Sequence, residues 1–199
     1  MNRLMIPAVA AALLTTACAW IDDVGKEKST AEFRLTPAEP LETDLECAAK
    51  QFPVTFEFFD LDTPSDAITH IRMYTAYPDA LWSQHALITF AHTDASTLEK
   101  CPPIQDFIGT AQPLTRDGCI RMAIQINACQ PQVTARVIGT LMLDAFSDKR
   151  GEYVKGSVEG TLVYFESVTG ATETAEKQVT LGALDGEFSF VNHAGAVWN

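Results

Sequence analysis

Apolar and polar residues alternate along several stretches of this 199-residue chain. In residues 52–58, phenylalanine or valine recurs at every second position, with Thr55 and Glu57 between them. The stretch Ile120–Ile126 alternates in the same way. Successive side chains of a β-strand point to opposite faces, so this period of two predicts strands with one buried face. A long amphipathic helix would need apolar residues three and four apart, and the chain shows no such pattern.

Other stretches extend this prediction. Residues 68–74 also alternate, and residues 86–91 are apolar at both odd and even positions, which indicates a strand at the centre of its sheet. The helical candidates are short, at residues 65–68 and 104–108.

The C-terminal third contains a weak internal repeat. Residues 138–143, 159–164 and 185–190 each carry a glycine, a polar residue and then apolar residues two apart. Each glycine can mark a bulge or a close approach of two backbones. We therefore predict an all-β domain over residues 47–199, an antiparallel β-sandwich of about 7–8 strands, with a small β-barrel as the alternative.

The N-terminus predicts export. Arg3 precedes an apolar run over residues 4–14, after which small residues lead to Cys18. The run is shorter than the roughly 20 residues that cross a bilayer, but it matches the hydrophobic region of a signal peptide. The order Leu14-Thr15-Thr16-Ala17-Cys18 resembles the lipobox of bacterial lipoproteins. This resemblance covers only the first 18 residues of the chain.

The resemblance implies that residues 1–17 are removed as a signal peptide and that Cys18 carries acyl chains, palmitate among them, as a membrane anchor. In lipoproteins of Gram-negative bacteria, an aspartate after the cysteine typically retains the protein at the inner membrane. Ala19 stands there in this chain, so the outer membrane of the cell envelope is favoured. The alternative is cleavage by the general signal peptidase after the site Ala17-Cys18-Ala19, which would release a soluble periplasmic or secreted protein beginning at Trp20. The glycine-led repeat also resembles small uncharacterised β-rich envelope lipoproteins, which implies fold more than activity.

Residues 18–46 predict a lipidated N-terminus followed by a flexible tether. They are rich in Asp, Glu, Lys, Thr and Pro, and no period of 2 or 3.6 persists among them. The alternative for part of this segment is an edge strand over residues 31–35.

Four cysteines remain once Cys18 is set aside, namely Cys47, Cys101, Cys119 and Cys129. An even number in an exported chain favours disulfides over zinc or redox motifs, and there is no CxxC pair. An extended strand after Cys119 would place it about 25–30 Å from Cys129, far beyond the 7 Å limit between bridged Cα atoms. We therefore predict the pairs Cys101–Cys119, which closes a proline-containing loop, and Cys47–Cys129.

Charge and motifs exclude several classes of function. The chain carries 26 acidic against 14 basic residues, a net charge of −12, which disfavours nucleic acid as a partner. No nucleophile elbow, phosphate loop or dinucleotide fingerprint occurs, and the four histidines are scattered, so we nominate no catalytic residue, metal site or cofactor. We expect a non-enzymatic binding or structural protein, held to the membrane by its acyl chains, with an envelope protein or glycan as partner. The alternative is an exported hydrolase that uses acidic residues.

One set of aromatic residues suggests a binding surface. Tyr74, Tyr77 and Trp82 cluster around a loop between two predicted strands. Aromatic side chains on such loops commonly contact sugars, peptides or partner proteins. The alternative is that they pack under the loop as part of the core.

Overall fold

The computed structural model describes residues 29–39, 41, 43–65, 68–76, 84–129, 132–169 and 174–192. These residues form ten strands, one short α-helix and one turn of 3-10 helix. In chain order the elements are β1 (Thr30–Pro37), α1 (Thr43–Ala49), β2 (Val54–Phe56), β3 (Phe58–Ser65), β4 (Ile68–Tyr74), β5 (His85–Ala91), η1 (Ile104–Phe107), β6 (Ala111–Leu114), β7 (Ile120–Ile126), β8 (Val133–Ala145), β9 (Tyr153–Thr169) and β10 (Thr174–Val191).

The strands form one antiparallel sheet in the order β2-β1-β10-β9-β8-β7-β5-β4-β3, with β6 pairing β8 beside this path. Only Glu57 separates β2 from β3, so one run of chain pairs β1 with its first part and β4 with its second. On the other side of the sheet, two strands share one partner: β7 pairs the first part of β8 and β6 pairs the part that follows. The sheet therefore returns to its starting strand and is nearly closed into a barrel of eight runs of chain.

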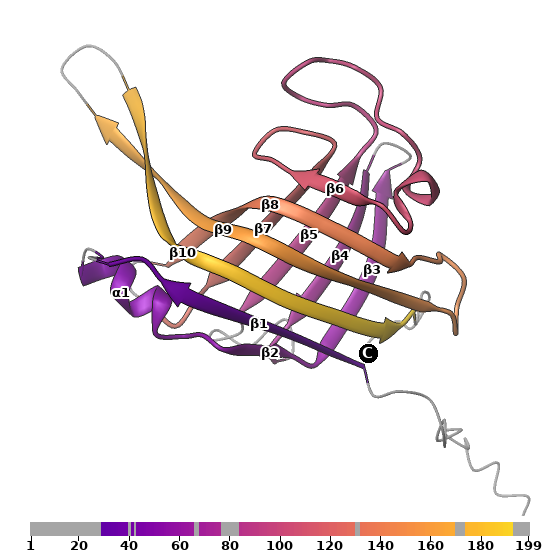
Figure 1. The fold of residues 1–199 in the computed structure, drawn as a ribbon, viewed down its shortest axis with the longest axis horizontal. Helices are drawn as coiled ribbons and strands as arrows, with labels where there is room; N and C mark the ends of the chain where they lie inside the picture. Colours follow the sequence, from indigo (N-terminus) through magenta and orange to yellow (C-terminus); the bar gives the residue numbers. More distant parts are fainter. Residues whose placement is uncertain are drawn as a thin grey trace, which may run out of the picture.

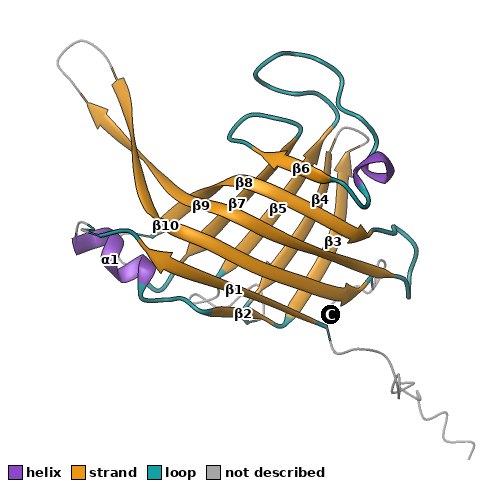
Figure 2. Cartoon of the chain, viewed as in Figure 1, coloured by secondary structure: helices purple, strands orange, loops and turns teal. Residues whose placement is uncertain are grey.

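The barrel is flattened into two layers. Figure 1 shows β1, β8, β9 and β10 in the front layer and β3, β4, β5 and β7 behind it, with the strands of the two layers crossing steeply. Among the described residues, helix occurs as α1 at one side of the molecule and as η1 near the opposite end of the strands (Figure 2). We call the layer of β1, β8, β9 and β10 the front layer and the layer of β3, β4, β5 and β7 the back layer.

The predicted all-β antiparallel fold is confirmed. A single sheet that curls through both layers corresponds to the stated alternative, the barrel, whereas a sandwich would have two separate sheets. Alternation alone does not distinguish them, because inward and outward residues alternate in both. Of the two helical candidates, residues 104–108 contain η1, whereas Ser65 ends β3 and Ile68 begins β4.

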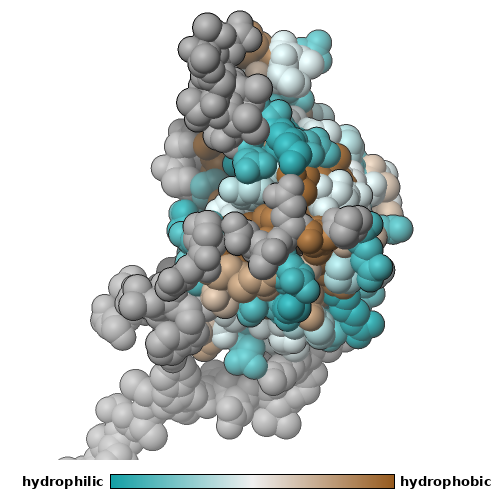
Figure 3. All heavy atoms as spheres, turned by 90° about the vertical axis from the view of Figure 1, so that its left-hand side faces the viewer, coloured by the Kyte–Doolittle hydropathy of each residue, from teal (hydrophilic) through white to brown (hydrophobic). Residues whose placement is uncertain are grey.

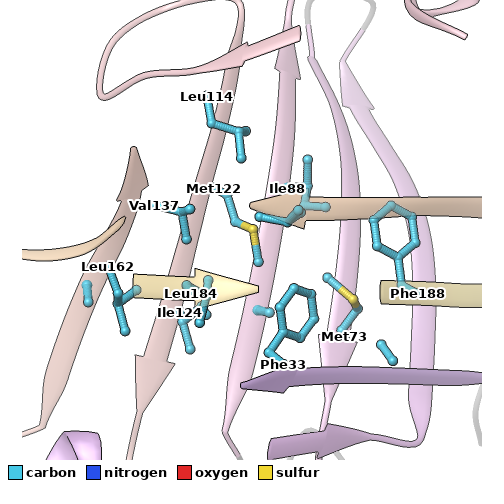
Figure 4. Packing of buried hydrophobic residues seen from close by; sticks show 14 of the residues in the cluster. Phe33, Met73, Ile88, Leu114, Met122, Ile124, Val137, Leu162, Leu184 and Phe188 are labelled. Atoms are coloured by element: carbon cyan, nitrogen blue, oxygen red, sulfur yellow. The ribbon is translucent and has the colours of Figure 1, made fainter. Parts of the chain in front are cut away.

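The core fills the space between the two layers. Burial alternates residue by residue along β4 and β7, as their sequences predict. Phe33 and Leu184 from the front layer point toward Met73, Ile88 and Met122 from the back layer (Figure 4), and all five side chains are almost completely buried. Burying a side chain of this size stabilises the fold by about 1.5–3 kcal/mol.

The predicted tether over residues 18–46 is wrong in its second half. Residues 30–37 form β1, which pairs with β10 on one side and β2 on the other, and α1 begins at Thr43. The alternative of a strand over residues 31–35 is right, but the strand is not at an edge. The alternation is weak because Ala31 and Phe33 are the only fully buried residues of β1. The described domain therefore begins well before Cys47.

Both predicted disulfides are present. Cys47 of α1 is bonded to Cys129 in the turn after β7, with Cα atoms 6.0 Å apart. Cys101 is bonded to Cys119 with Cα atoms 5.6 Å apart. The first bond closes a segment of 82 residues and the second one of 18. In the chain-entropy model these loops contribute about 4.5 and about 3 kcal/mol of stability.

The repeated glycines lie where backbones or rings approach closely. Gly139 and Gly160 pair with each other, and a Cβ atom on Gly139 would lie 2.2 Å from the carbonyl oxygen of Glu159. Gly186 pairs with Phe33, and a Cβ atom there would lie 2.2 Å from Cδ1 of that ring. The prediction of a close backbone approach is confirmed for Gly139 and Gly160, whereas Gly186 makes room for a side chain, the ring of Phe33.

Gly186→Ala is expected to destabilise the protein by about 1–3 kcal/mol, because the new methyl group overlaps the buried ring of Phe33. Equilibrium unfolding in urea measures this loss. In a Phe33→Leu background the same substitution should cost much less, since the ring is gone. An equal cost in both backgrounds would show that the ring is not what excludes a side chain at position 186.

Candidate functional site

The predicted aromatic patch lies only partly within the described residues. Tyr74 is the last residue of β4 and is half-buried. Tyr77 and Trp82 belong to residues 77–83, which lie outside the described residues, as does Cys18. The patch as a whole stays a prediction, and Tyr74 is the member whose neighbours the structure gives.

Tyr74 lies at one corner of a larger surface, which we call the arginine face. It consists of the outward-pointing side chains of the back layer and of β8, the strand beside it. Three of the seven arginines of the chain stand on it, Arg72 on β4, Arg121 on β7 and Arg136 on β8. Each occupies a partly or fully exposed position of an alternating strand.

Strand register arranges these side chains in rows across the sheet. One row runs from Arg72 through Leu87 and Ala123 to Arg136. Three steps between neighbouring strands separate the two arginines, about 14 Å along the sheet at 4.8 Å a step. The next row runs from Tyr74 through His85 and Gln125 to Thr134.

A depression of about 400 Å³ lies on these two rows. Its floor includes Leu87 and Ala123, and Arg72 and Arg136 stand at its two ends. Ala123 projects only a methyl group between longer neighbours, which accounts for the hollow. The depression thus has an apolar floor with cationic ends.

Arg72 is held in place by its neighbours. Its guanidinium forms an ion pair with Asp62 on β3 at 2.8 Å and lies 3.4 Å from Nδ1 of His70. It also hydrogen-bonds the side chain of Tyr74. Its charge is therefore partly balanced and its orientation restricted.

Arg121 and Arg136 differ from Arg72. Within the described part of the chain, neither has a carboxylate within 4.0 Å, although acidic residues outnumber basic ones by 26 to 14. The Nε atom of Arg121 is buried without a hydrogen-bond partner. An unsatisfied buried donor costs roughly 1–3 kcal/mol. These two arginines are the cations on this face that remain able to pair with a ligand.

Two histidines add a pH-dependent charge to the face. Burial lowers the pKa of His85, whose ring meets Tyr74 edge to face with centroids 4.8 Å apart. Burial, and then the positive charge of Arg72, lower the pKa of His70, and the more distant Arg121 acts in the same direction. The Nε2 atom of His85 is buried without a hydrogen-bond partner. Both rings are therefore mainly neutral at pH 7.

The outward side of the front layer has the opposite character. Acidic residues from three neighbouring strands lie there, namely Glu32, Glu159, Asp185 and Glu187. Arg34 is already paired with Glu32 at 2.9 Å. The two outward sides of the barrel therefore differ in charge, a difference that the net charge of −12 does not reveal.

Two other depressions lack the combination of cationic ends and an apolar floor. One of about 330 Å³ on the front layer is lined by Asp144, Lys155 and Glu187 among others, so its charges are mixed. Another, of about 700 Å³, lies between β1 and α1, with Leu35 and Phe52 in its walls. Figure 3 views the molecule from the side that carries α1, where apolar surface is broken up by hydrophilic side chains.

Sequence reasoning did not find the arginine face. The alternation of residues 68–74 and 120–126 implies that Arg72 and Arg121 lie on the polar side of their strands, which is correct. The missing information was that β7 pairs β5 and β8, since this order brings Arg136 into line with Arg72. Arg136 stands on the polar side of its own alternating strand, which is the only signal that marked it.

In the ranges given above, no group of three or more His, Cys, Asp or Glu is placed to hold a metal ion. No helix in the same ranges has the length and hydropathy needed to cross a membrane. Comparisons with protein-family models, with curated proteins and with solved structures gave no significant match.

The histidines predict that stability falls on acidification. Because the pKa of both His70 and His85 is lowered in the fold, the unfolded chain takes up protons below pH 6.5 that the folded chain does not. The free energy of unfolding should therefore decrease as the pH falls from 7.5 to 5.5. Urea unfolding at several pH values measures this slope.

A His70→Gln/His85→Gln double variant should show a flatter slope over the same pH range. His92→Gln is the matched control, because this histidine is exposed and lies outside the face. If the double variant keeps the slope of the unchanged protein, His70 and His85 are not the cause of the pH dependence.

Proposed function

We propose that this protein is a non-enzymatic binding protein of the cell envelope, anchored by acyl chains on Cys18, and that it binds an anionic partner through the arginine face. The observation that carries the binding role is the pair Arg121 and Arg136, without ion-pair partners in the described part of an acidic chain. Guanidinium groups are well suited to carboxylate, sulfate and phosphate oxygens, which they bind through paired hydrogen bonds.

The depression supports binding more than catalysis. It combines cations, one tyrosine and an apolar floor, and no carboxylate is among the described residues that line it. Asp60 and Asp62 stand on β3 beside Arg72. Asp62 is engaged with Arg72. A hydrolase that used paired acids would instead need carboxylates facing each other across the bound substrate.

Export and anchoring rest on the N-terminal sequence. The two disulfides fit an oxidising compartment, which is where exported proteins fold. Because β1 begins at Thr30, only eleven residues separate Cys18 from the barrel. Fully extended, such a segment spans at most about 40 Å, so the anchor would keep the barrel close to the membrane surface.

The anchor is tested by growing cells that express the protein with radiolabelled palmitate. We expect label on the protein, and none on a Cys18→Ser variant, since that side chain is the acceptor. Label that persists in Cys18→Ser would contradict acylation at Cys18. An unlabelled protein beginning at Trp20 would instead support release by the general signal peptidase.

Anion binding is tested with inorganic sulfate as the probe. In a ¹⁵N NMR titration of the purified protein, we expect shifts to concentrate on the amides around Arg121, Ala123 and Arg136. An Arg121→Gln/Arg136→Gln variant should bind sulfate at least tenfold more weakly. Arg34→Gln is the control, because it removes an arginine from the front layer. Shifts that are equally large around Arg34 would show that sulfate has no preference for the face.

A further inference from the structure

The shape of the depression restricts what kind of anion it takes. The backbone positions of Arg72 and Arg136 lie about 14 Å apart along the row. The guanidinium of Arg72 is held by Asp62 on β3, on the side of β4 away from Arg136, so one small anion does not bridge the two arginines. Leu87 and Ala123 fill the interval, and neither offers a side-chain hydrogen bond. A ligand that uses the whole row must therefore be elongated, with an apolar surface between its charges.

The second row supplies complementary polar groups. Gln125 and Thr134 border the apolar floor, and Tyr74 stands at its other end. An amide and a hydroxyl can donate to and accept from ligand hydroxyls, and an aromatic ring packs against the C–H face of a sugar. A sugar ring has an apolar C–H face and hydroxyl groups at its edge. This mixed surface fits the apolar floor, the polar side chains of Gln125 and Thr134 and the ring of Tyr74 better than a flexible acidic peptide does.

The charges assign unequal roles to the two ends. At the β3 end, Asp60 stands next to Arg72 and Asp62 pairs with it, so ligand anions are only weakly attracted there. At the β8 end, Arg136 and nearby Arg121 have no carboxylate within 4.0 Å among the described residues, although the charge of Arg121 adds to the Ser96 hydrogen bonds that lower the pKa of Asp94. A broad anionic membrane surface would meet Asp60 and Asp62 as well as the arginines, which disfavours it as the occupant.

Resting on the proposed function, we infer that the arginine face binds an acidic oligosaccharide laid across β4, β5, β7 and β8. Its sugar rings lie over Leu87 and Ala123, and an acidic group on one ring pairs with Arg136 and Arg121. Arg72, fixed by Asp62, orients the other end of the ligand. The recognised chemistry is a chain of sugar rings that carry carboxylate, sulfate or phosphate groups.

Isothermal titration calorimetry of the purified protein tests this inference. The probes are tetragalacturonate, monomeric galacturonate, neutral maltotetraose, tetraglutamate and inorganic sulfate. We expect tetragalacturonate to bind at least tenfold more tightly than galacturonate or tetraglutamate, and maltotetraose to bind weakest. A sulfated tetrasaccharide, compared with tetragalacturonate, then tells which acidic group is preferred.

Variants separate the roles of charge and floor. Arg136→Gln should weaken tetragalacturonate at least tenfold, and Arg34→Gln on the front layer should leave its affinity unchanged. Ala123→Leu changes no charge but fills the floor, so it should also weaken tetragalacturonate. A urea unfolding curve for each variant verifies that it is folded.

The outcomes distinguish this inference from the proposed function. If sulfate binds at the face but tetragalacturonate gains nothing over galacturonate, the oligosaccharide is ruled out while anion binding stands. If tetraglutamate binds as tightly as tetragalacturonate, the partner is an acidic polypeptide instead. If no probe binds, sulfate included, the proposed function itself fails.

Discussion

The pairing of β1 with β10 is the interaction on which the rest of the structure depends. It joins residues 30–37 to residues 182–189, the first and last strands of the described chain, and so closes the sheet on itself. Without it both strands would present unpaired backbone groups, and Phe33 would lose its place over Gly186. A contact between such distant residues is costly in chain entropy. The Cys47–Cys129 bond lowers that cost, because it ties α1, which follows β1, to the turn after β7.

Closure also decides where a ligand can bind. A barrel of about eight strands is just wide enough for its own side chains to fill. Here Phe33, Met73 and Ile88, among many others, occupy that space and are almost completely buried. Chemistry that recognises a partner is therefore left to the outward positions. Once the register is fixed, every second residue of neighbouring strands falls into a row, and the arginine face is one consequence of that order.

Much of the fold could be predicted from the sequence, because alternation reports directly on which side chains are buried. It located β4, β5 and β7, and cysteine geometry led to both disulfides. It failed at β1, where Ala31 and Phe33 alternate with charged residues over too short a stretch to stand out from a tether. It could not give the strand order, since alternation is a local property whereas the alignment of Arg72 with Arg136 depends on three separate strand pairings. The candidate site depended on that order, so only Tyr74 was named in advance.

An acidic protein that binds an acidic ligand is physically consistent because the two charge effects act over different distances. At physiological ionic strength, screening limits charge interactions to about 8 Å between exposed groups. The acidic residues of the front layer lie farther than this from Arg136: Glu159 on β9 pairs with Thr140, four residues or about 13 Å along β8 from Arg136. At contact the ligand therefore meets mainly Arg121 and Arg136. At longer range the net charge of −12 still slows the approach of large polyanions such as nucleic acids. The charge distribution therefore favours short ligands that fit one row over long ones that carry charge everywhere.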